Sequence, residues 1–267
     1  ASDYPPNLKA ASSAELVELL AHRNRWWRLT AQRLLVERQD TEVVEKLRSM
    51  STGHPRPRGR LHALYTLEGL SALTPQGVAG RLDDPHPGVR EHAVRLAERY
   101  DELVEDLAAR TDDPSARVAF RLALSLGAHS GSTALAGLAD LATHRTRHEW
   151  IRTALLTSRP GSSVRLLERC REQGFFDLPA EGRLHYARRV PEVIGRRAEK
   201  EQVDRLVRLA GELDGEHRGR WQRAMLEGLS EGLRTHEDPP PVDSDALRPL
   251  IDASARAVRA AARSLRE

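Results

Sequence analysis

Leucine and valine recur at the three-to-four-residue spacing of an amphipathic α-helix in five separate segments of the chain. These segments are 13–21, 41–49, 74–82, 100–110 and 132–142. Helix breakers follow them, as in Asp83–Gly88 and Asp112–Ser115, where Asp or Ser can cap a helix and Pro can open one. No stretch carries the alternating pattern of a strand. The pattern therefore predicts an all-α chain of short helices joined by tight turns.

A second helix in each repeat is indicated by the pattern x-Arg-x-x-Ala-x-x-(x)-Leu. Clear copies surround Arg28, Arg60 and Arg90, and weaker copies surround Arg117 and Arg152. Neighbouring arginines of this set lie 32, 30, 27 and 35 residues apart, which leaves room for two short helices and two turns. The spacing predicts compact HEAT-like pairs, each made of a first helix, a turn and a second helix that begins just before the arginine.

The predicted fold is an all-α, right-handed α-α superhelix of the HEAT or armadillo type with about seven helical pairs. Because one pair cannot bury its apolar faces alone, stacked pairs share a continuous core. We expect a single solenoid over residues 1–267, made of an N-terminal linker (1–11), regular short repeats (12–158), longer degenerate repeats (159–236), a Pro-rich loop (237–244) and a terminal helix (245–267). Pro191 is expected to break or kink one of the longer helices.

The five repeated arginines form a predicted ladder, because each occupies the same place in its repeat. One interpretation is a row of guanidinium groups that binds anions. The favoured interpretation is structural: acidic residues such as Asp84 and Asp113 stand in the turns just ahead of the second helices, so each arginine can pair with an Asp of its own or the adjacent repeat.

Composition narrows the chemistry that the chain can perform. Hydrophobic residues make up 39% and aromatic residues only 4%, so the core must consist of Leu, Ala and Val. A net charge of +3, with acidic and basic residues interspersed, is a weak field, and a nucleic-acid partner is not expected. The single cysteine, Cys170, excludes an internal disulfide or a C-x-x-C site and is expected to be a buried, inert thiol. No apolar run reaches the length of a membrane span.

No motif for catalysis, cofactor binding or metal binding stands out. His144 and His148 are four residues apart but are separated by a predicted turn, so a metal site is not expected there. Carboxylate pairs such as Asp83 and Asp84 are expected to lie in exposed turns rather than in an apolar cleft that would separate their pKa values. The sequence predicts a chain without an active site of its own.

One exposed contact surface is a candidate. Trp26 and Trp27 are neighbours on a helix and diverge by about 100 degrees, so at least one ring is expected to be exposed. Aromatic and arginine side chains are enriched at protein interfaces, so a contact surface could comprise Arg25, Trp26, Trp27, Arg28, Trp150 and Trp221. The favoured alternative is that the tryptophans cap the N-terminal end of the core.

Two segments, Asn24–Leu35 and His62–Leu70, resemble the PBS-lyase-like short HEAT repeats of the PVC-type haem-binding proteins, a family of membrane-bound dehydrogenases. The likeness covers most of the chain. In that family the repeats lie between an N-terminal β-propeller, similar to glucose or sorbosone dehydrogenases, and a C-terminal cytochrome c domain with a C-x-x-C-H motif. The opening residues Tyr4–Leu8 resemble the linker that leaves the propeller.

The resemblance implies an extracytoplasmic, non-catalytic scaffold that holds an oxidising domain and an electron acceptor together. This sequence contains neither neighbour, so it is expected to be an excised central module whose partners are the flanking domains. Haem c is expected only in the cytochrome domain, and no cofactor is expected in this chain.

Two other functions remain as alternatives. A HEAT-like alkylpurine DNA glycosylase, or another nucleic-acid-binding protein, would use Trp26, Trp27 and Arg28 beside a basic groove. The weak net charge and the lack of an acidic residue next to the tryptophan pair argue against it. A chromophore-binding protein similar to the phycobilin lyases would need an apolar groove.

Overall fold

The computed structural model describes residues 7–158, 163–253 and 255–265, and within these ranges it is helical and contains no strand. The described residues form sixteen α-helices, with one short 3-10 helix before the first of them and two others between later ones. The chain divides into two compact units, Ala1–Leu103 and Val104–Glu267, each of which has its own packing. The predicted all-α repeat fold is confirmed, whereas a single solenoid over the whole chain stays a prediction.

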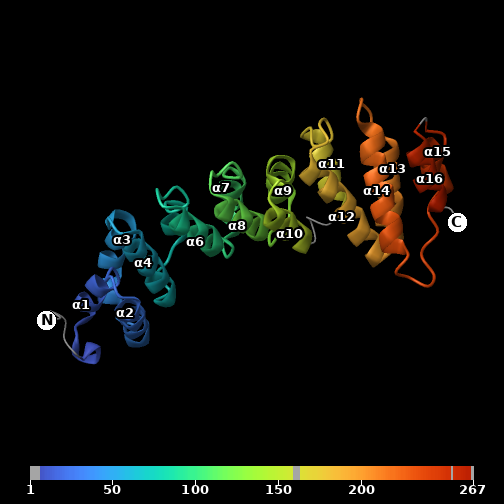
Figure 1. Cartoon of the computed structure of the whole chain (residues 1–267). Coiled ribbons are helices and arrows are strands. Elements are labelled where there is room, and N and C mark those ends of the chain that lie inside the picture. The colour runs from blue at the N-terminus through green and yellow to red at the C-terminus, as the bar shows by residue number, and fades with distance from the viewer. Residues whose placement is uncertain (1–6, 159–162, 254, 266–267) are drawn as a thin grey trace. The chain divides into compact units, whose positions relative to one another are not determined.

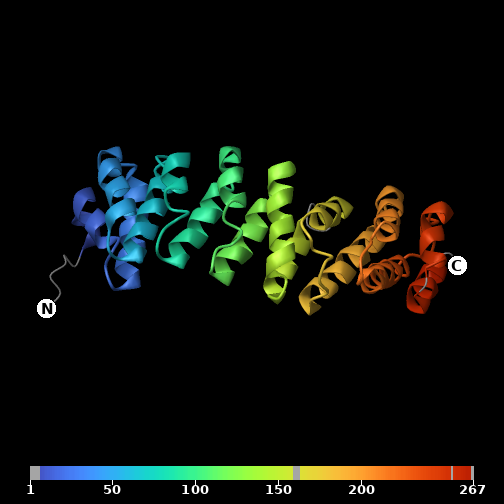
Figure 2. The ribbon, with the colours of Figure 1, turned by 90° about the horizontal axis from the view of Figure 1, so that it is seen from above.

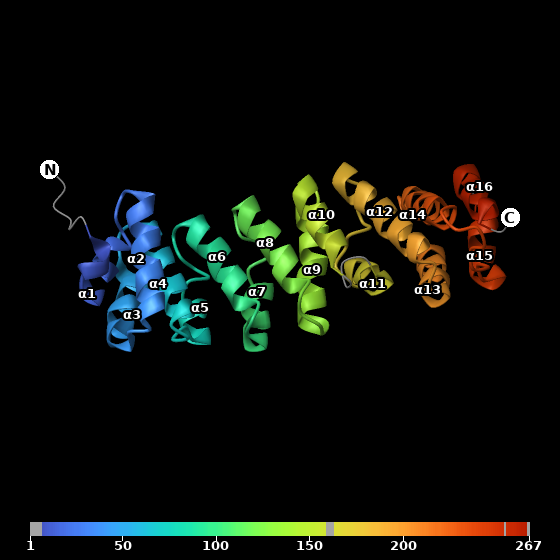
Figure 3. The ribbon, with the colours of Figure 1, turned by 90° about the horizontal axis from the view of Figure 1, so that it is seen from below.

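The first unit contains three helical pairs (Figures 1 and 3). The first helices are α1 (Ser13–Leu19), α3 (Val44–Gly53) and α5 (Pro75–Ala79), and the second helices are α2 (Arg25–Arg38), α4 (Pro57–Gly69) and α6 (Pro87–Ala97). The 3-10 helices are η1 (Leu8–Ala10), η2 (Thr41–Val43) and η3 (Asp101–Leu103). Each helix packs on its pair partner, and the second helices pack in series, α2 on α4 and α4 on α6.

The second unit contains five pairs, which run from green to red in Figure 2. The first helices are α7 (Val104–Ala108), α9 (Ser132–Arg145), α11 (Val164–Glu172), α13 (Lys200–Gly211) and α15 (Ser244–Ile251). The second helices are α8 (Ala116–Leu126), α10 (Glu149–Thr157), α12 (Glu181–Arg197), α14 (Arg218–Leu233) and α16 (Arg256–Ser264). First helices contact the next first helix and second helices the next second helix throughout the unit. The described residues thus form eight pairs, one more than the predicted seven or so.

Local sequence explains where many helices begin. Ser12 caps α1 in a capping box: its hydroxyl accepts from the Glu15 amide at 3.2 Å, and the Glu15 carboxylate accepts from the Ser12 amide at 2.7 Å. Pro57, Pro75 and Pro87 stand in the first turns of α4, α5 and α6, where a missing amide hydrogen costs no bond. Pro87, which belongs to a breaker segment recognised in the sequence, therefore acts at a helix start.

The terminal helix predicted over residues 245–267 is wrong, because two helices, α15 and α16, occupy this part of the described chain. The chain leaves α15 at Asp252, and α16 begins at Arg256. The break lets α15 pack on α13 while α16 packs on α14 and α15, so both apolar faces are covered. A single straight helix could not have covered the ends of both neighbours.

Pro191 does not break its helix, so of the two effects expected from the sequence only a kink stays a prediction. It lies buried inside α12, which runs without interruption from Glu181 to Arg197. The part of α12 around Pro191 packs closely on α14. The two backbones approach so closely that a Cβ atom built on Gly228 of α14 would lie 2.0 Å from the carbonyl oxygen of Arg188 in α12. Tertiary packing here outweighs the loss of one backbone hydrogen bond.

No helix among the described residues combines the length and the apolar character that crossing a bilayer requires. The core of both units is made chiefly of Leu, Ala and Val, as the composition predicted. Among the residues that the structure describes, large rings are fully buried only at Trp221, Tyr186 and Phe175, within the second unit. Cys170 is buried as expected, and burial raises the pKa of its thiol, which keeps it protonated and unreactive.

Candidate functional site

The ladder arginines hold the turns of their own repeats. In five pairs, an arginine at the fourth position of the second helix donates from Nη1 to a backbone carbonyl six residues earlier, a contact that we call the turn clamp. The contacts join Arg28 to His22 (2.8 Å), Arg60 to His54 (2.8 Å), Arg90 to Asp84 (2.9 Å), Arg152 to Thr146 (2.6 Å) and Arg259 to Ala253 (2.7 Å). The turn between the two helices is thereby closed by a charged donor.

Two positions of the ladder differ from the prediction. Arg259 was not predicted, although Val258-Arg259-Ala260-Ala261-Ala262 followed by Leu265 fits the sequence pattern. Arg117 was assigned to the ladder, but it is the second residue of α8 and is exposed. The fourth position of α8 is Ala119, whose amide donates to Ser115 as the amide of Arg28 donates to Asn24. The local pattern was therefore two residues out of register in this repeat.

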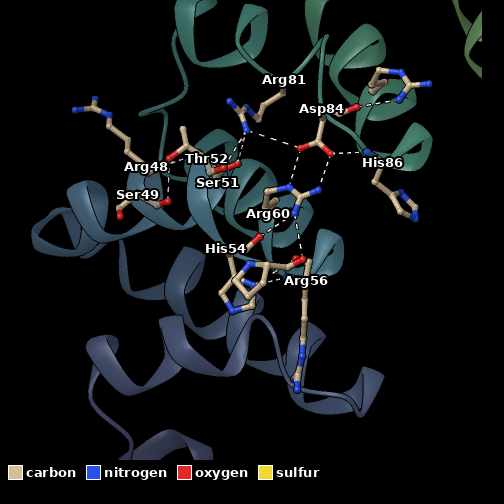
Figure 4. Close-up of polar contacts among 12 residues, drawn as sticks. Arg48, Ser49, Ser51, Thr52, His54, Arg56, Arg60, Arg81, Asp84 and His86 are labelled. Atoms are coloured by element: carbon tan, nitrogen blue, oxygen red, sulfur yellow. Dashed lines mark hydrogen bonds and ion pairs between the residues drawn. The ribbon is translucent and has the colours of Figure 1, made fainter. Parts of the chain in front are cut away.

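Arg60 makes the predicted pair with a turn aspartate, in the arrangement of Figure 4. Its Nε donates to Oδ2 of Asp84 at 2.7 Å and its Nη2 donates to Oδ1 at 2.6 Å, so the pair is bidentate. Both side chains are buried, so placing Asp84 in an exposed turn was wrong, and Arg81 lies 3.8 Å from the same carboxylate. The ion pair fixes α4 against the turn that precedes α6.

The pKa of the Asp84 carboxyl reflects opposing effects. Burial alone raises this pKa, but the hydrogen bonds from Arg60 and from the His86 amide, with the charges of Arg60 and Arg81, outweigh burial and leave the pKa below its ordinary value. The carboxylate is therefore charged in the folded chain at neutral pH. A charge that is buried, paired and fully hydrogen-bonded supports the structural interpretation of this ladder position.

Arg28 has no aspartate partner, contrary to the expectation. The position equivalent to Asp84 in the next turn is His54, and Arg28 contacts no carboxylate among the described residues. Its Nε instead donates to Nε2 of His62 at 3.2 Å, and Nδ1 of His62 lies 2.6 Å from Oε1 of Gln32. Burial, followed by the charges of Arg28 and Arg25, lowers the pKa of His62 to about 4.

Of the two adjacent tryptophans, one is exposed, as a contact residue would be, and the other packs on the core. Trp26 is exposed over 61% of its surface, whereas Trp27 is half-buried and packs on the core of the first unit. Their rings meet edge to face with centroids 5.6 Å apart. Leu29, one turn after Trp26 on α2, is also exposed (46%). The expectation of one exposed ring is confirmed, and Arg28 lies buried beneath this surface rather than on it.

The remaining tryptophans behave differently from each other. Trp150, in the second unit, is 72% exposed and occupies the second position of α10, as Trp26 does in α2. Trp221 is fully buried between Phe175 and Phe176, and its Nε1 donates to the Phe176 carbonyl at 2.6 Å. Including Trp221 in the contact surface was therefore wrong. It stands at the fourth position of α14, where other repeats carry the clamp arginine.

The second positions of the second helices form the candidate contact edge of each unit. This edge is defined by the exposed residues Trp26 and Arg58 in the first unit and Arg117 and Trp150 in the second. Two residues later in α2, α4 and α10 stands a clamp arginine, which anchors the first turn of the helix. Sequence reasoning found the tryptophans but missed Arg58 and misplaced Arg117, because helix starts were inferred only to within two residues.

Within the described ranges, no cluster of three or more His, Cys, Asp or Glu side chains has the arrangement of a metal site. His144 pairs with Asp140 across 3.0 Å, and His148 accepts from Arg147, so these two histidines have separate partners. The contact edge offers rings and guanidinium groups, which bind by stacking and ion pairing and supply no nucleophile or general base.

No protein-family model matches the chain, and no curated protein matches it in sequence. Among solved structures, it is similar to a designed armadillo repeat protein in complex with a (KR)4 peptide, at 14% identity and a TM-score of 0.33. The alignment covers 96% of this chain and 98% of the designed protein.

Proposed function

We propose that the chain is a non-catalytic helical-repeat scaffold that binds a protein partner through its contact edge. The observation that carries this proposal is the exposure of Trp26 and Trp150 at the same helix position, with 61% and 72% of each side chain accessible. An exposed tryptophan costs free energy in water, whereas tryptophan and arginine are both enriched among the residues that contribute most to binding at protein interfaces. Two such anchors at equivalent positions indicate recognition rather than packing.

The clamp arginines make these anchors rigid. Arg28 and Arg152 follow Trp26 and Trp150 by two residues and tie the first helical turn to the preceding loop at 2.8 Å and 2.6 Å. A side chain that is held in place before binding loses less conformational entropy when the partner arrives. The ladder thus serves recognition indirectly, by positioning the residues beside it.

The partner that we propose is a flanking domain of a larger redox protein. The resemblance of Asn24–Leu35 and His62–Leu70 to the PVC-type haem-binding proteins supports a place between a β-propeller dehydrogenase-like domain and a cytochrome c domain. Substrate oxidation and haem binding would then belong to those domains. The whole protein would be extracytoplasmic. The chain itself would set the distance between them.

The decisive experiment measures binding of the 267-residue chain to a β-propeller segment and a cytochrome c segment encoded beside it and expressed separately. Isothermal calorimetry gives the affinity, and protection of tryptophan fluorescence from acrylamide shows whether exposed rings are covered. Trp26→Ala and Trp150→Ala are expected to weaken binding by roughly thirtyfold or more each, since tryptophans that anchor an interface contribute about 2 kcal/mol or more.

Leu178→Ala is the matched control, because Leu178 is 66% exposed but lies outside the contact edge. Equal affinity of the parent chain and both tryptophan variants would refute the contact edge. Duplex DNA at two salt concentrations completes the set: binding that falls steeply with salt, without any protein binding, would replace the scaffold by the nucleic-acid alternative.

A further inference from the structure

A pocket of about 520 Å³ lies in the second unit, where the end of α9, the start of α10 and the start of α12 meet. Its polar lining comes mainly from arginine, histidine and threonine side chains, with one acidic residue. The residues that line it are Thr143, His144, Thr146, Arg147, Arg152, Ala180, Glu181, Gly182, Arg183 and His185. None of the contact-edge residues lines this pocket, so it is a separate feature of the chain.

The three arginines of the pocket lack acidic partners. Arg152 donates to the Thr146 carbonyl, Arg183 donates to the Thr143 carbonyl at 2.8 Å, and Arg147 donates to the ring of His148. None of the three pairs with a carboxylate in the described part of the chain. Three guanidinium groups against the single Glu181 leave two positive charges in excess around one pocket.

Two buried polar atoms in the pocket lining have no hydrogen-bond partner: Oγ1 of Thr143 and Nε of Arg152. Thr143 is only 3% exposed, so its hydroxyl has little contact with bulk water. Buried donors without acceptors are costly and uncommon in folded proteins. Both groups are donors that an anion could satisfy.

The start of α12 adds a third source of donors. Ala180 is the N-cap of this 17-residue helix and provides no side-chain cap, so the first amide groups of α12 are not satisfied by a capping side chain. Ala180, Glu181 and Gly182 all line the pocket. A Cβ atom on Gly182 would lie 2.2 Å from the Thr146 carbonyl oxygen, so only glycine allows the helix start to approach the α9–α10 turn this closely.

We propose that this pocket binds a phosphoryl group, held by Arg147, Arg152 and the N-terminus of α12. The excess of two positive charges matches a phosphomonoester, which carries about −1.5 to −2 at neutral pH. Donors that approach from three elements suit the three oxygens of a tetrahedral group better than the two oxygens of a planar carboxylate. The same chemistry is presented by a free phosphomonoester and by a phosphorylated side chain of a protein. The proposal does not rest on the scaffold function, because a small phosphomonoester needs no protein partner.

His185 provides a local probe for the test. Burial, then the charges of Arg152 and Arg189, lower the pKa of His185, and Glu149 partly opposes them. A dianion bound in the pocket is expected to raise this pKa, which nuclear magnetic resonance can follow on the full chain. Binding at any other place would leave the titration of His185 unchanged.

The experiment titrates the full chain with inorganic phosphate at constant ionic strength, with acetate as the carboxylate comparison. Arg147→Gln is expected to weaken phosphate binding about tenfold, the effect of losing one charge-assisted hydrogen bond. Glu181→Gln is expected to tighten it several-fold by removing the only carboxylate of the lining. Arg165→Gln is the control, because it removes the same charge from an exposed position of α11 in the same unit.

Saturable phosphate binding that follows this order and raises the pKa of His185 supports the site. Absence of saturation by phosphate, equal affinity of Arg147→Gln and the parent chain, or tighter binding of acetate than of phosphate overturns it. Phosphoserine and a phosphoserine peptide then separate the two sources: a peptide that binds at least tenfold more tightly than the amino acid assigns the site to a phosphorylated protein. Equal affinities assign it to a free phosphomonoester.

Discussion

Arg28 and His62 share a hydrogen bond in which the Nε–H of Arg28 donates to Nε2 of His62 at 3.2 Å. Since Nε2 accepts, the ring proton must be on Nδ1, which lies 2.6 Å from the acceptor Oε1 of Gln32. The ring is therefore neutral and in a single tautomer, consistent with a pKa lowered to about 4 by burial and by the charges of Arg28 and Arg25. This arrangement makes the contact between α2 and α4 sensitive to acid.

The stability of the folded chain is expected to fall in acid because of His62. In the unfolded chain His62 titrates near its ordinary pKa of about 6.5, so below this pH the unfolded state binds a proton that the folded state does not bind until about pH 4. The stabilisation is present above pH 6.5 and is lost as the pH falls toward 4. The free energy of unfolding of the parent chain, measured by thermal unfolding, should fall by on the order of 1–2 kcal/mol between pH 6.5 and pH 4. This value is smaller than the full pKa shift would give, because the ring is partly exposed to solvent.

His62→Gln is the control for this prediction, because glutamine keeps a donor and an acceptor but does not titrate. The difference in unfolding temperature between the two chains should shrink or reverse between pH 6.5 and pH 4. A constant difference over that range would contradict the neutral ring.

The buried pair of Arg60 and Asp84 should be the most costly ion pair to break. Asp84→Ala leaves the Arg60 guanidinium buried without its carboxylate and is expected to cost about 3–5 kcal/mol in urea unfolding. Glu45→Ala, which removes the partner of Arg48 in an exposed pair, should cost at most about 0.5 kcal/mol. Similar losses in both variants would mean that burial does not decide the strength of these pairs.

The approach of α14 to α12 should tolerate no side chain at Gly228. Gly228→Ala places a methyl group 2.0 Å from the Arg188 carbonyl oxygen, a backbone atom that cannot move aside, and should cost about 3 kcal/mol or more. Gly219→Ala, on the same helix, meets its nearest atom at 3.6 Å and should be neutral or stabilising by at most about 1 kcal/mol. Chemical denaturation of both variants measures the contrast.

Replacing Thr143 tests whether its hydroxyl stabilises the fold or binds the anion. Thr143→Val keeps the shape of the side chain and removes a hydroxyl that has no partner, so stability should stay the same or rise by about 1 kcal/mol. Phosphate binding should weaken in the same variant if the hydroxyl contacts the anion. A large loss of stability, measured by thermal unfolding, would show instead that the hydroxyl is bonded within the folded chain.

The repeat architecture was predictable because its signals are local. Breaker residues such as Pro57 and Pro87 start helices through interactions within a few residues, and the arginine pattern follows the same helix position in most repeats. Arg117 was misplaced because α8 begins at Ala116, two residues later than the pattern suggests. Helix starts depend on the cap geometry, which a pattern of residue types determines only approximately.

Features that depend on distant segments were not predictable. Trp221 is buried by Phe175 and Phe176, which lie 45 or more residues before it in the chain, and nothing near Trp221 in sequence indicates this. The cationic pocket combines residues of α9, α10 and α12 whose convergence requires the folded unit. The division of the predicted last helix into α15 and α16 was not predictable for the same reason, because it depends on the packing of α15 on α13 and of α16 on α14.

The turn clamp joins atoms whose residues are only six positions apart, so a repeat that has the clamp contains both groups that close its own turn. A duplicated gene segment of one period would therefore encode a unit with a ready-made turn and would need compatible side chains only at its two junctions. The pair of Arg60 and Asp84 is different, because its two residues belong to successive repeats and would be separated by an insertion between them. Whole repeats that are closed by a turn clamp should therefore be the easiest to insert or delete, in evolution or by engineering. Repeats joined by an ion pair such as that of Arg60 and Asp84 should be the hardest to separate.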